Sequence, residues 1–252
     1  MGKPPKPGPC IHCLKHFDEL TWDHVLPKSW YPDTTPENLE KWKIPSCKEC
    51  NKRYGELEEY LLFRLGLCIG PEEAKAAGIS EKALRSIKPE YAKNDRDKRI
   101  RQGKREKIVK ELIHFKELPK EGVFPDFGPQ PHLVYGRYLG VLVSCEKLEA
   151  LGEKLVRGIT YLTENQLISE EHRIQVNFIE DGKAPQVQQL FETHTKVYHR
   201  GPGFVVARAS AADDPISAIL KIQIWGRLNI YAGVYRKEYE KMIEELKPQN
   251  ST

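Results

Sequence analysis

Four cysteines near the start of the 252-residue chain have the spacing of a metal-binding site. They form two CxxC pairs, Cys10 with Cys13 and Cys47 with Cys50. Two such pairs supply the four thiolates of a tetrahedral site that suits Zn²⁺. Because every ligand is sulfur and none is water, the pattern predicts a structural zinc ion rather than a catalytic one. A redox CxxC and unrelated buried thiols are the alternative interpretations.

The residues between and after the two pairs predict two strands and a helix. Residues 20–29 favour a short strand followed by a turn, residues 38–45 a second strand, and a helix is expected from Asn51 onward. The helix is indicated by apolar residues near the 3.6-residue period, namely Tyr54, Leu57, Leu61, Leu62 and Leu65. The predicted order is therefore β, β, α, with a cysteine pair at each end of the strands.

Three motifs in this region together resemble a known family. They are Asp23-His24-Val25-x-Pro27-x-Ser29, Asn38-Leu39 and Cys47-x-x-Cys50-Asn51. In this order they are similar to the HNH (His-Me finger, ββα-metal) endonucleases in their zinc-stapled form. The resemblance covers about residues 8–66, a quarter of the chain.

The resemblance implies a role for each motif residue. His24 would be the general base, Asn38 would brace the loop between the strands, and Asp23 with Asn51 would bind one catalytic Mg²⁺, for which Mn²⁺ is expected to substitute. The chain departs from the family's letters at Asn51, where the last residue of the name-giving motif is histidine. A carboxylate with an amide oxygen favours the hard ion Mg²⁺ over Zn²⁺.

The chemistry of phosphodiester hydrolysis agrees with these roles. The attacking water must lose a proton, which a neutral imidazole with a pKa of about 6.5 can accept near pH 7. Successive side chains of a strand point to opposite faces, so Asp23 and His24 need a local bend or metal-bound water to act together. Taken singly, Asn51 could be a helix N-cap and Asn38 a turn residue.

A concentrated basic segment follows these motifs. Residues 82–120 contain 14 Lys or Arg against 6 acids, a local net charge of +8, whereas the whole chain carries +4. The segment is expected to form a basic helical arm, with the apolar residues between 108 and 115 on one helical face. Arg99, Arg101, Lys104 and Arg105 are expected to contact the phosphate backbone of DNA. A solvated linker helix is the alternative.

The rest of the chain predicts a small α+β unit. Residues 145–161 favour an amphipathic helix, and a mainly antiparallel sheet is expected from strands at residues 173–179, 203–208, 218–225 and 229–234. A strand at 133–138 and a short helix at 185–194 are also expected. Cys68 and Cys145 lack a partner at ligand spacing and are expected to be buried thiols.

The expected fold class is α+β in three segments. Residues 1–70 would form the zinc-stapled nuclease module, 71–122 a basic helical connector, and 123–252 an accessory domain. Hydrophobic residues make up 39% of the chain, which predicts folded cores rather than global disorder. No apolar run approaches the ~20 residues of a membrane helix, and the first residues lack the apolar stretch of a secretory signal. A reducing, cytoplasmic location without a membrane partner is expected.

The sequence thus predicts a metal-dependent HNH endonuclease that hydrolyses DNA. A non-catalytic zinc-containing protein that binds nucleic acid is the main alternative, and the joint presence of Asp23, His24 and Asn51 favours the nuclease. A redox-active CxxC protein is a third interpretation. The sequence leaves open RNA as substrate, the form of the DNA, base specificity, and whether a homodimer or a partner protein supplies specificity.

Overall fold

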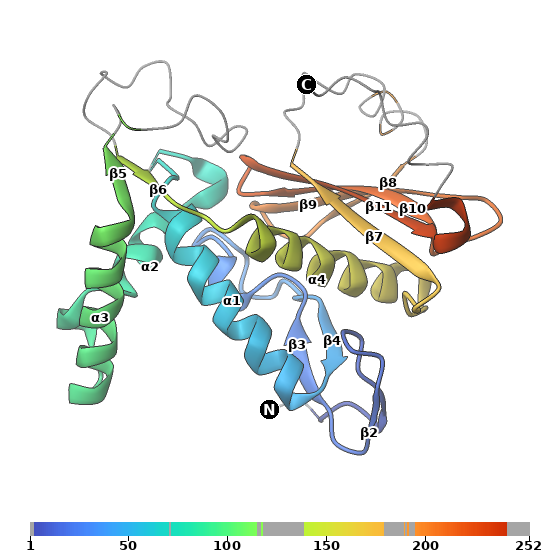
Figure 1. The fold of residues 1–252 in the computed structure, drawn as a ribbon, viewed down its shortest axis with the longest axis horizontal. Helices are drawn as coiled ribbons and strands as arrows, with labels where there is room; N and C mark the ends of the chain where they lie inside the picture. Colours follow the sequence, from blue (N-terminus) through green and yellow to red (C-terminus); the bar gives the residue numbers. More distant parts are fainter. Residues whose placement is uncertain are drawn as a thin grey trace.

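The structure is a computed structural model that describes residues 3–70, 72–114, 117, 139–178, 189, 191 and 195–240. The expected strand at 133–138 lies outside the described residues, as does the expected helix at 185–194 except for residues 189 and 191. The helices are α1 (Lys48–Gly66), α2 (Ile79–Arg85), α3 (Asp95–Glu111) and α4 (Cys145–Glu164). With the strands given below they form the expected α+β fold (Figure 1).

The N-terminal part has the expected ββα order. Two short strands, β1 (Gly8–Pro9) and β2 (His16–Phe17), pair on either side of the first CxxC, and β3 (Thr21–His24) pairs antiparallel with β4 (Lys43–Ser46). The second strand is shorter than expected, because a turn occupies residues 36–39. Helix α1 begins at Lys48 with Cys47 as its N-cap, so Asn51 lies in the first turn and is not the cap.

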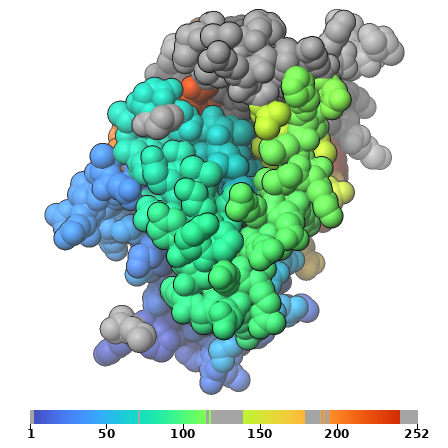
Figure 2. Space-filling model, turned by 90° about the vertical axis from the view of Figure 1, so that its left-hand side faces the viewer, coloured from blue at the N-terminus to red at the C-terminus, as the bar shows by residue number. Residues whose placement is uncertain are grey.

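The basic segment is helical in part and packs against α1. Phe63, Ala83 and Ile108 form a small apolar cluster that joins α1, α2 and α3. Residues 72–114 make up one broad face of the molecule (Figure 2). The expected helical face at 108–115 is wrong in detail, because α3 ends at Glu111 and the next residues form β5 (Leu112–His114), paired with β6 (Leu139–Val141). Phe115 lies outside the described residues.

The C-terminal part contains an antiparallel five-stranded sheet in the order β7-β11-β10-β9-β8. Its strands are β7 (His172–Asn177), β8 (Lys196–His199), β9 (Phe204–Ser210), β10 (Ala218–Ile224) and β11 (Leu228–Arg236). Alternate residues of β10 are buried, as a strand with one face on a core requires. The four expected core residues of α4 are all buried, namely Leu148, Leu151, Leu155 and Ile159. Helix α4 lies between this sheet and the ββα unit (Figure 1).

One hydrophobic core joins the ββα unit to the five-stranded sheet. It includes Val25 and Ile44 from the first and Phe204 and Leu220 from the second, all fully buried. The division into segments 1–70, 71–122 and 123–252 stays a prediction, but the first and third share this core. Among the described residues, no helix has both the length and the apolar character to cross a membrane.

The two isolated cysteines differ from expectation. Both Cys68 and Cys145 are exposed, so the prediction of buried thiols is wrong. Each lies at a helix end, where the chain leaves the packed core: Cys68 follows α1, and Cys145 is the first residue of α4.

Candidate active site and metal centre

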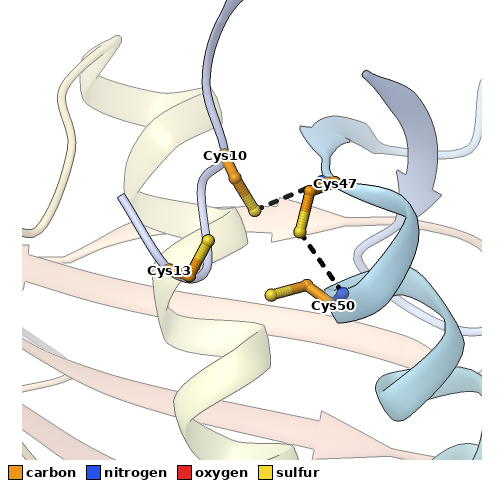
Figure 3. A group of neighbouring side chains, drawn as sticks. All are labelled: Cys10, Cys13, Cys47 and Cys50. Atoms are coloured by element: carbon orange, nitrogen blue, oxygen red, sulfur yellow. Dashed lines mark hydrogen bonds between the residues drawn. The ribbon is translucent and has the colours of Figure 1, made fainter. Parts of the chain in front are cut away.

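The two CxxC pairs come together as one cluster. Their four sulfur atoms all lie within 4.8 Å of one another (Figure 3). The backbone N–H of Cys47 donates to Cys10 Sγ at 3.3 Å, and that of Cys50 donates to Cys47 Sγ at 3.4 Å. In a tetrahedron with Zn–S bonds of ~2.3 Å the sulfurs are about 3.8 Å apart. The cluster is therefore compact enough for a zinc site, as predicted.

The electrostatics of the cluster favour a bound cation. Burial opposes ionisation of Cys10, but backbone N–H groups of Cys13, Cys47 and His12 outweigh it and lower the pKa of this thiol to about 7. Burial, followed by the neighbouring sulfurs, raises the pKa of Cys50. Four sulfurs this close cannot all be thiolates unless a cation lies among them.

A pocket of about 540 Å³ opens beside β3 and the start of α1. The residues that line it are Trp22, Asp23, His24, Lys28, Ser29, Asn51 and Glu58. Three of the four residues predicted for catalysis and metal binding, Asp23, His24 and Asn51, thus share one pocket although α1 is distant from β3 in sequence.

Asn51 is held against β3 by its amide nitrogen. Nδ2 donates to Thr21 Oγ1 at 2.9 Å and to the carbonyl oxygen of Trp22 at 3.3 Å. These bonds fix the first turn of α1 on the strand that carries Asp23 and His24. An amide anchored through its nitrogen can offer only Oδ1 to a metal ion.

Asp23 is buried and contacts two other buried side chains. Its Oδ2 atom is 2.9 Å from His12 Nε2, and its Oδ1 atom is 3.3 Å from Lys154 Nζ. His12 lies inside the first CxxC, so this hydrogen bond links the cysteine cluster to the pocket. Sequence reasoning gave no such role to either partner. The position of His12 between two cysteines could have pointed to a role in the site. Nothing in the sequence points to Lys154, which lies far along the chain on an amphipathic helix.

His24 is the last residue of β3. It lines the same pocket as Asp23, although the two are successive strand residues. Burial, and then the positive charge of Lys43, lower the pKa of His24 against the attraction of Asp23. The imidazole is therefore neutral at pH 7, the form that can accept a proton.

Comparison with protein families gives a match over this region. Residues 10–57 match the HNH endonuclease family. This part of the chain is an HNH domain. Comparisons with curated proteins and with solved structures found no match.

The HNH domain covers the cysteine cluster, β3, β4 and the first part of α1, so the resemblance noted in the sequence is confirmed. It indicates a nuclease or a related nucleic-acid function. The matched segment ends one residue before Glu58, and it does not include Lys154.

Asn38 is placed differently from the other HNH residues. It lies in an exposed turn between β3 and β4 and is not among the residues that line the pocket. Its bracing role in the HNH domain stays a prediction.

The four predicted DNA-contacting residues of α3 fall into two pairs. Arg99 and Arg105 are exposed. Arg101 forms an ion pair with Asp97 of the same helix at 3.1 Å and donates to the carbonyl oxygen of Arg85 on α2, and Lys104 forms an ion pair with Glu59 on α1. The second pair therefore helps to hold α3 against α1 and α2.

A larger hollow of about 700 Å³ lies between α4 and β7. Its described lining is mostly charged and polar, and none of the residues predicted from the sequence contributes to it. Asp23, His24 and Asn51, to which the resemblance assigns the HNH chemistry, line the smaller pocket at β3 instead.

Proposed function

We propose that this protein is a metal-dependent HNH endonuclease that hydrolyses DNA phosphodiester bonds. The observation that carries the proposal is the single pocket lined by Asp23, His24 and Asn51 within the HNH domain. A protein that only bound nucleic acid would not need a neutral imidazole beside two oxygen ligands in one pocket.

The residues of the pocket fit a hard divalent ion. Asp23 offers a carboxylate, whose two oxygens have about four acceptor sites, so its contacts with His12 and Lys154 leave capacity for a metal. Asn51 offers Oδ1. Oxygen ligands suit Mg²⁺, and Mn²⁺ accepts the same set. When bound, the ion would stabilise negative charge on the phosphate and on the leaving oxygen.

His24 acts as the general base in this proposal. Its neutral imidazole accepts a proton from the water that attacks phosphorus, while the bond from phosphorus to the leaving 3′ oxygen breaks. The leaving oxygen takes a proton from solvent, and the imidazolium returns its proton to solvent. Lys28 lines the same pocket and places a positive charge where a phosphate would enter. Asn38 is proposed to brace the loop that carries these residues.

The cysteine cluster is proposed to hold a structural zinc ion through Cys10, Cys13, Cys47 and Cys50. The domain around it has little core of its own, so metal binding would supply folding free energy directly. The zinc site would also order the pocket, because His12 lies between two of the cysteines and its hydrogen bond holds the Asp23 carboxylate in place.

The basic helix α3 is proposed to contact the DNA backbone through Arg99, Arg101, Lys104 and Arg105. The first and last of these are exposed for such contacts, while the other two also hold α3 in place. Phosphate contacts of this kind add affinity for any sequence.

The proposal is tested by incubating the purified protein with supercoiled, linear duplex, single-stranded and branched DNA. Each form is assayed with Mg²⁺, with Mn²⁺ and with EDTA. We expect metal-dependent cleavage of at least one form and none in EDTA. Binding without cleavage of any form would overturn the proposal in favour of a non-catalytic nucleic-acid-binding protein.

A further inference from the structure

A lysine from outside the HNH domain reaches the candidate active site. Lys154, on α4, has no solvent exposure. Its Nζ atom donates to the carbonyl oxygen of His24 at 2.6 Å, lies 3.3 Å from Asp23 Oδ1, and forms an ion pair with Glu58. All three partners line the pocket described above.

A buried ammonium is costly unless it is paired, so this position requires an explanation. Lys154 has two carboxylates, Asp23 and Glu58, for its one charge. With both carboxylates ionised, the three groups together carry one net negative charge beside the pocket. That balance still attracts a divalent cation, but less strongly than two free carboxylates would.

Close packing of α4 on the HNH domain determines the position of Lys154. One turn after Lys154, a Cβ atom on Gly158 would lie 2.7 Å from Val25 Cγ2 and 3.3 Å from Ile44 Cδ1. Only a residue without a side chain allows this approach of α4 to β4 and to Val25, which follows β3. The register is therefore fixed, and Lys154 lies above the end of β3.

Glu58 lies where it could compete as a metal ligand. It follows Asn51 by two helical turns on the same face of α1, and both side chains line the pocket. Burial raises the pKa of Glu58, against the attraction of Lys154. Without Lys154, the Glu58 carboxylate would therefore bind a metal ion in the pocket.

We propose that Lys154 is a positioning residue of the nuclease site, which orients Asp23 toward the metal and keeps Glu58 away from it. The inference rests on the proposed function and adds α4 to the active site. The ammonium binds one oxygen of each carboxylate and so reserves the metal position for Asp23 and Asn51. Without it, Glu58 becomes a third oxygen ligand, and the metal binds more tightly in a geometry that does not support cleavage.

The test compares Lys154→Met, Glu58→Gln and the double variant with the wild-type protein. Lys147→Met is the matched control, because Lys147 is an exposed lysine of the same helix whose ammonium contacts the ring of Tyr60 instead. Mn²⁺ affinity of the zinc-loaded proteins is measured by electron paramagnetic resonance without DNA, and DNA cleavage is measured separately at saturating Mn²⁺.

We expect Lys154→Met to bind Mn²⁺ about tenfold more tightly and to cleave DNA at least about a hundredfold more slowly. Glu58→Gln alone should weaken Mn²⁺ binding only slightly, through the loss of one nearby negative charge, because Glu58 is not a ligand while Lys154 holds it. The double variant should lose the tightened binding. Lys147→Met should match wild type in both measurements.

A purely structural lysine gives a different pattern, in which Lys154→Met lowers thermal stability while Mn²⁺ affinity stays the same or falls. That result overturns the proposal.

The double variant removes one charge of each sign, so it keeps the comparison available if the single variant does not fold. The double variant should still cleave DNA slowly, because Asp23 is no longer oriented, so wild-type cleavage by the double variant would also contradict the role of Lys154. If the wild-type protein cleaves no DNA, the proposed function fails, while the Mn²⁺ affinities still decide the role of Lys154.

Discussion

The indole N–H of Trp225 donates a 2.7 Å hydrogen bond to the carbonyl oxygen of Trp30, and the two rings lie 4.9 Å apart. Trp30 belongs to the HNH domain, and Trp225 follows β10 in the five-stranded sheet. Both side chains are fully buried. This contact, together with the shared core, indicates that the HNH domain and the sheet fold as one unit.

Replacing Trp225 with Phe should therefore destabilise both parts together. The change leaves the buried carbonyl oxygen of Trp30 without its donor, which costs roughly 1–3 kcal/mol before any loss of packing. Urea unfolding followed by fluorescence and circular dichroism should show one shared transition, moved to lower urea. Trp22→Phe, at an exposed tryptophan, should move it much less. Two separate transitions in the wild-type protein would contradict a single folding unit.

The cysteine cluster should bind one zinc ion per chain. Cys47→Ser removes a thiolate, and we expect loss of zinc and a lower melting temperature of the shared unfolding transition. Cys68→Ser is the matched control, because Cys68 is exposed and outside the cluster. Elemental analysis and thermal unfolding make the comparison. Finding no zinc in a folded preparation that cleaves DNA would remove the structural role of the metal.

Gly55 should matter for substrate access rather than for packing. A Cβ atom there meets nothing within 4 Å, and the same is true of Gly103 in α3. Gly55 lies on the face of α1 that carries Asn51 and Glu58, and it lines a hollow of about 470 Å³ that adjoins the pocket.

Both Gly55→Ala and Gly103→Ala should raise helix stability, by up to about 1 kcal/mol each. Only Gly55→Ala should slow cleavage, because its methyl group would obstruct a DNA backbone that approaches α1. Melting temperatures and cleavage rates of the two variants test this. Equal cleavage by both would mean that DNA does not approach this face.

The basic helix can be tested by its two pairs of residues. Arg99→Ala with Arg105→Ala should reduce the slope of log K against log salt by up to about 1.8, since each duplex phosphate contact contributes roughly 0.9. Thermal stability should not change, because both residues are exposed. Arg101→Ala with Lys104→Ala should lower stability as well, since two ion pairs are lost. An unchanged slope in both variants would show that α3 does not contact DNA.

Local patterns in the sequence predict much of this fold and the cysteine cluster. Paired cysteines at CxxC spacing, the apolar period of α1 and α4, and the alternation of β10 each depend on residues close together in the chain. Boundaries were less accurate, because capping by Cys47 and the turn at residues 36–39 depend on particular hydrogen bonds.

The contacts across the two halves of the chain could not be predicted in this way. Lys154 looks like one more charged residue on an amphipathic helix, and only the packing of Gly158 on Val25 and Ile44 shows that it is buried beside Asp23. The exposure of Cys68 and Cys145 likewise depends on where each helix ends in three dimensions. Such features depend on the tertiary arrangement, which local patterns in one sequence do not specify.

Nicking of supercoiled DNA by His24→Ala tests the central claim most directly. We predict a loss of at least about a hundredfold in the Mg²⁺-dependent rate, with DNA affinity retained, because a general base acts in the transition state. His199→Ala, at an exposed histidine of β8, is the control and should nick at the wild-type rate. A His24→Ala variant that nicks as fast as wild type would contradict the assignment of this pocket as the active site.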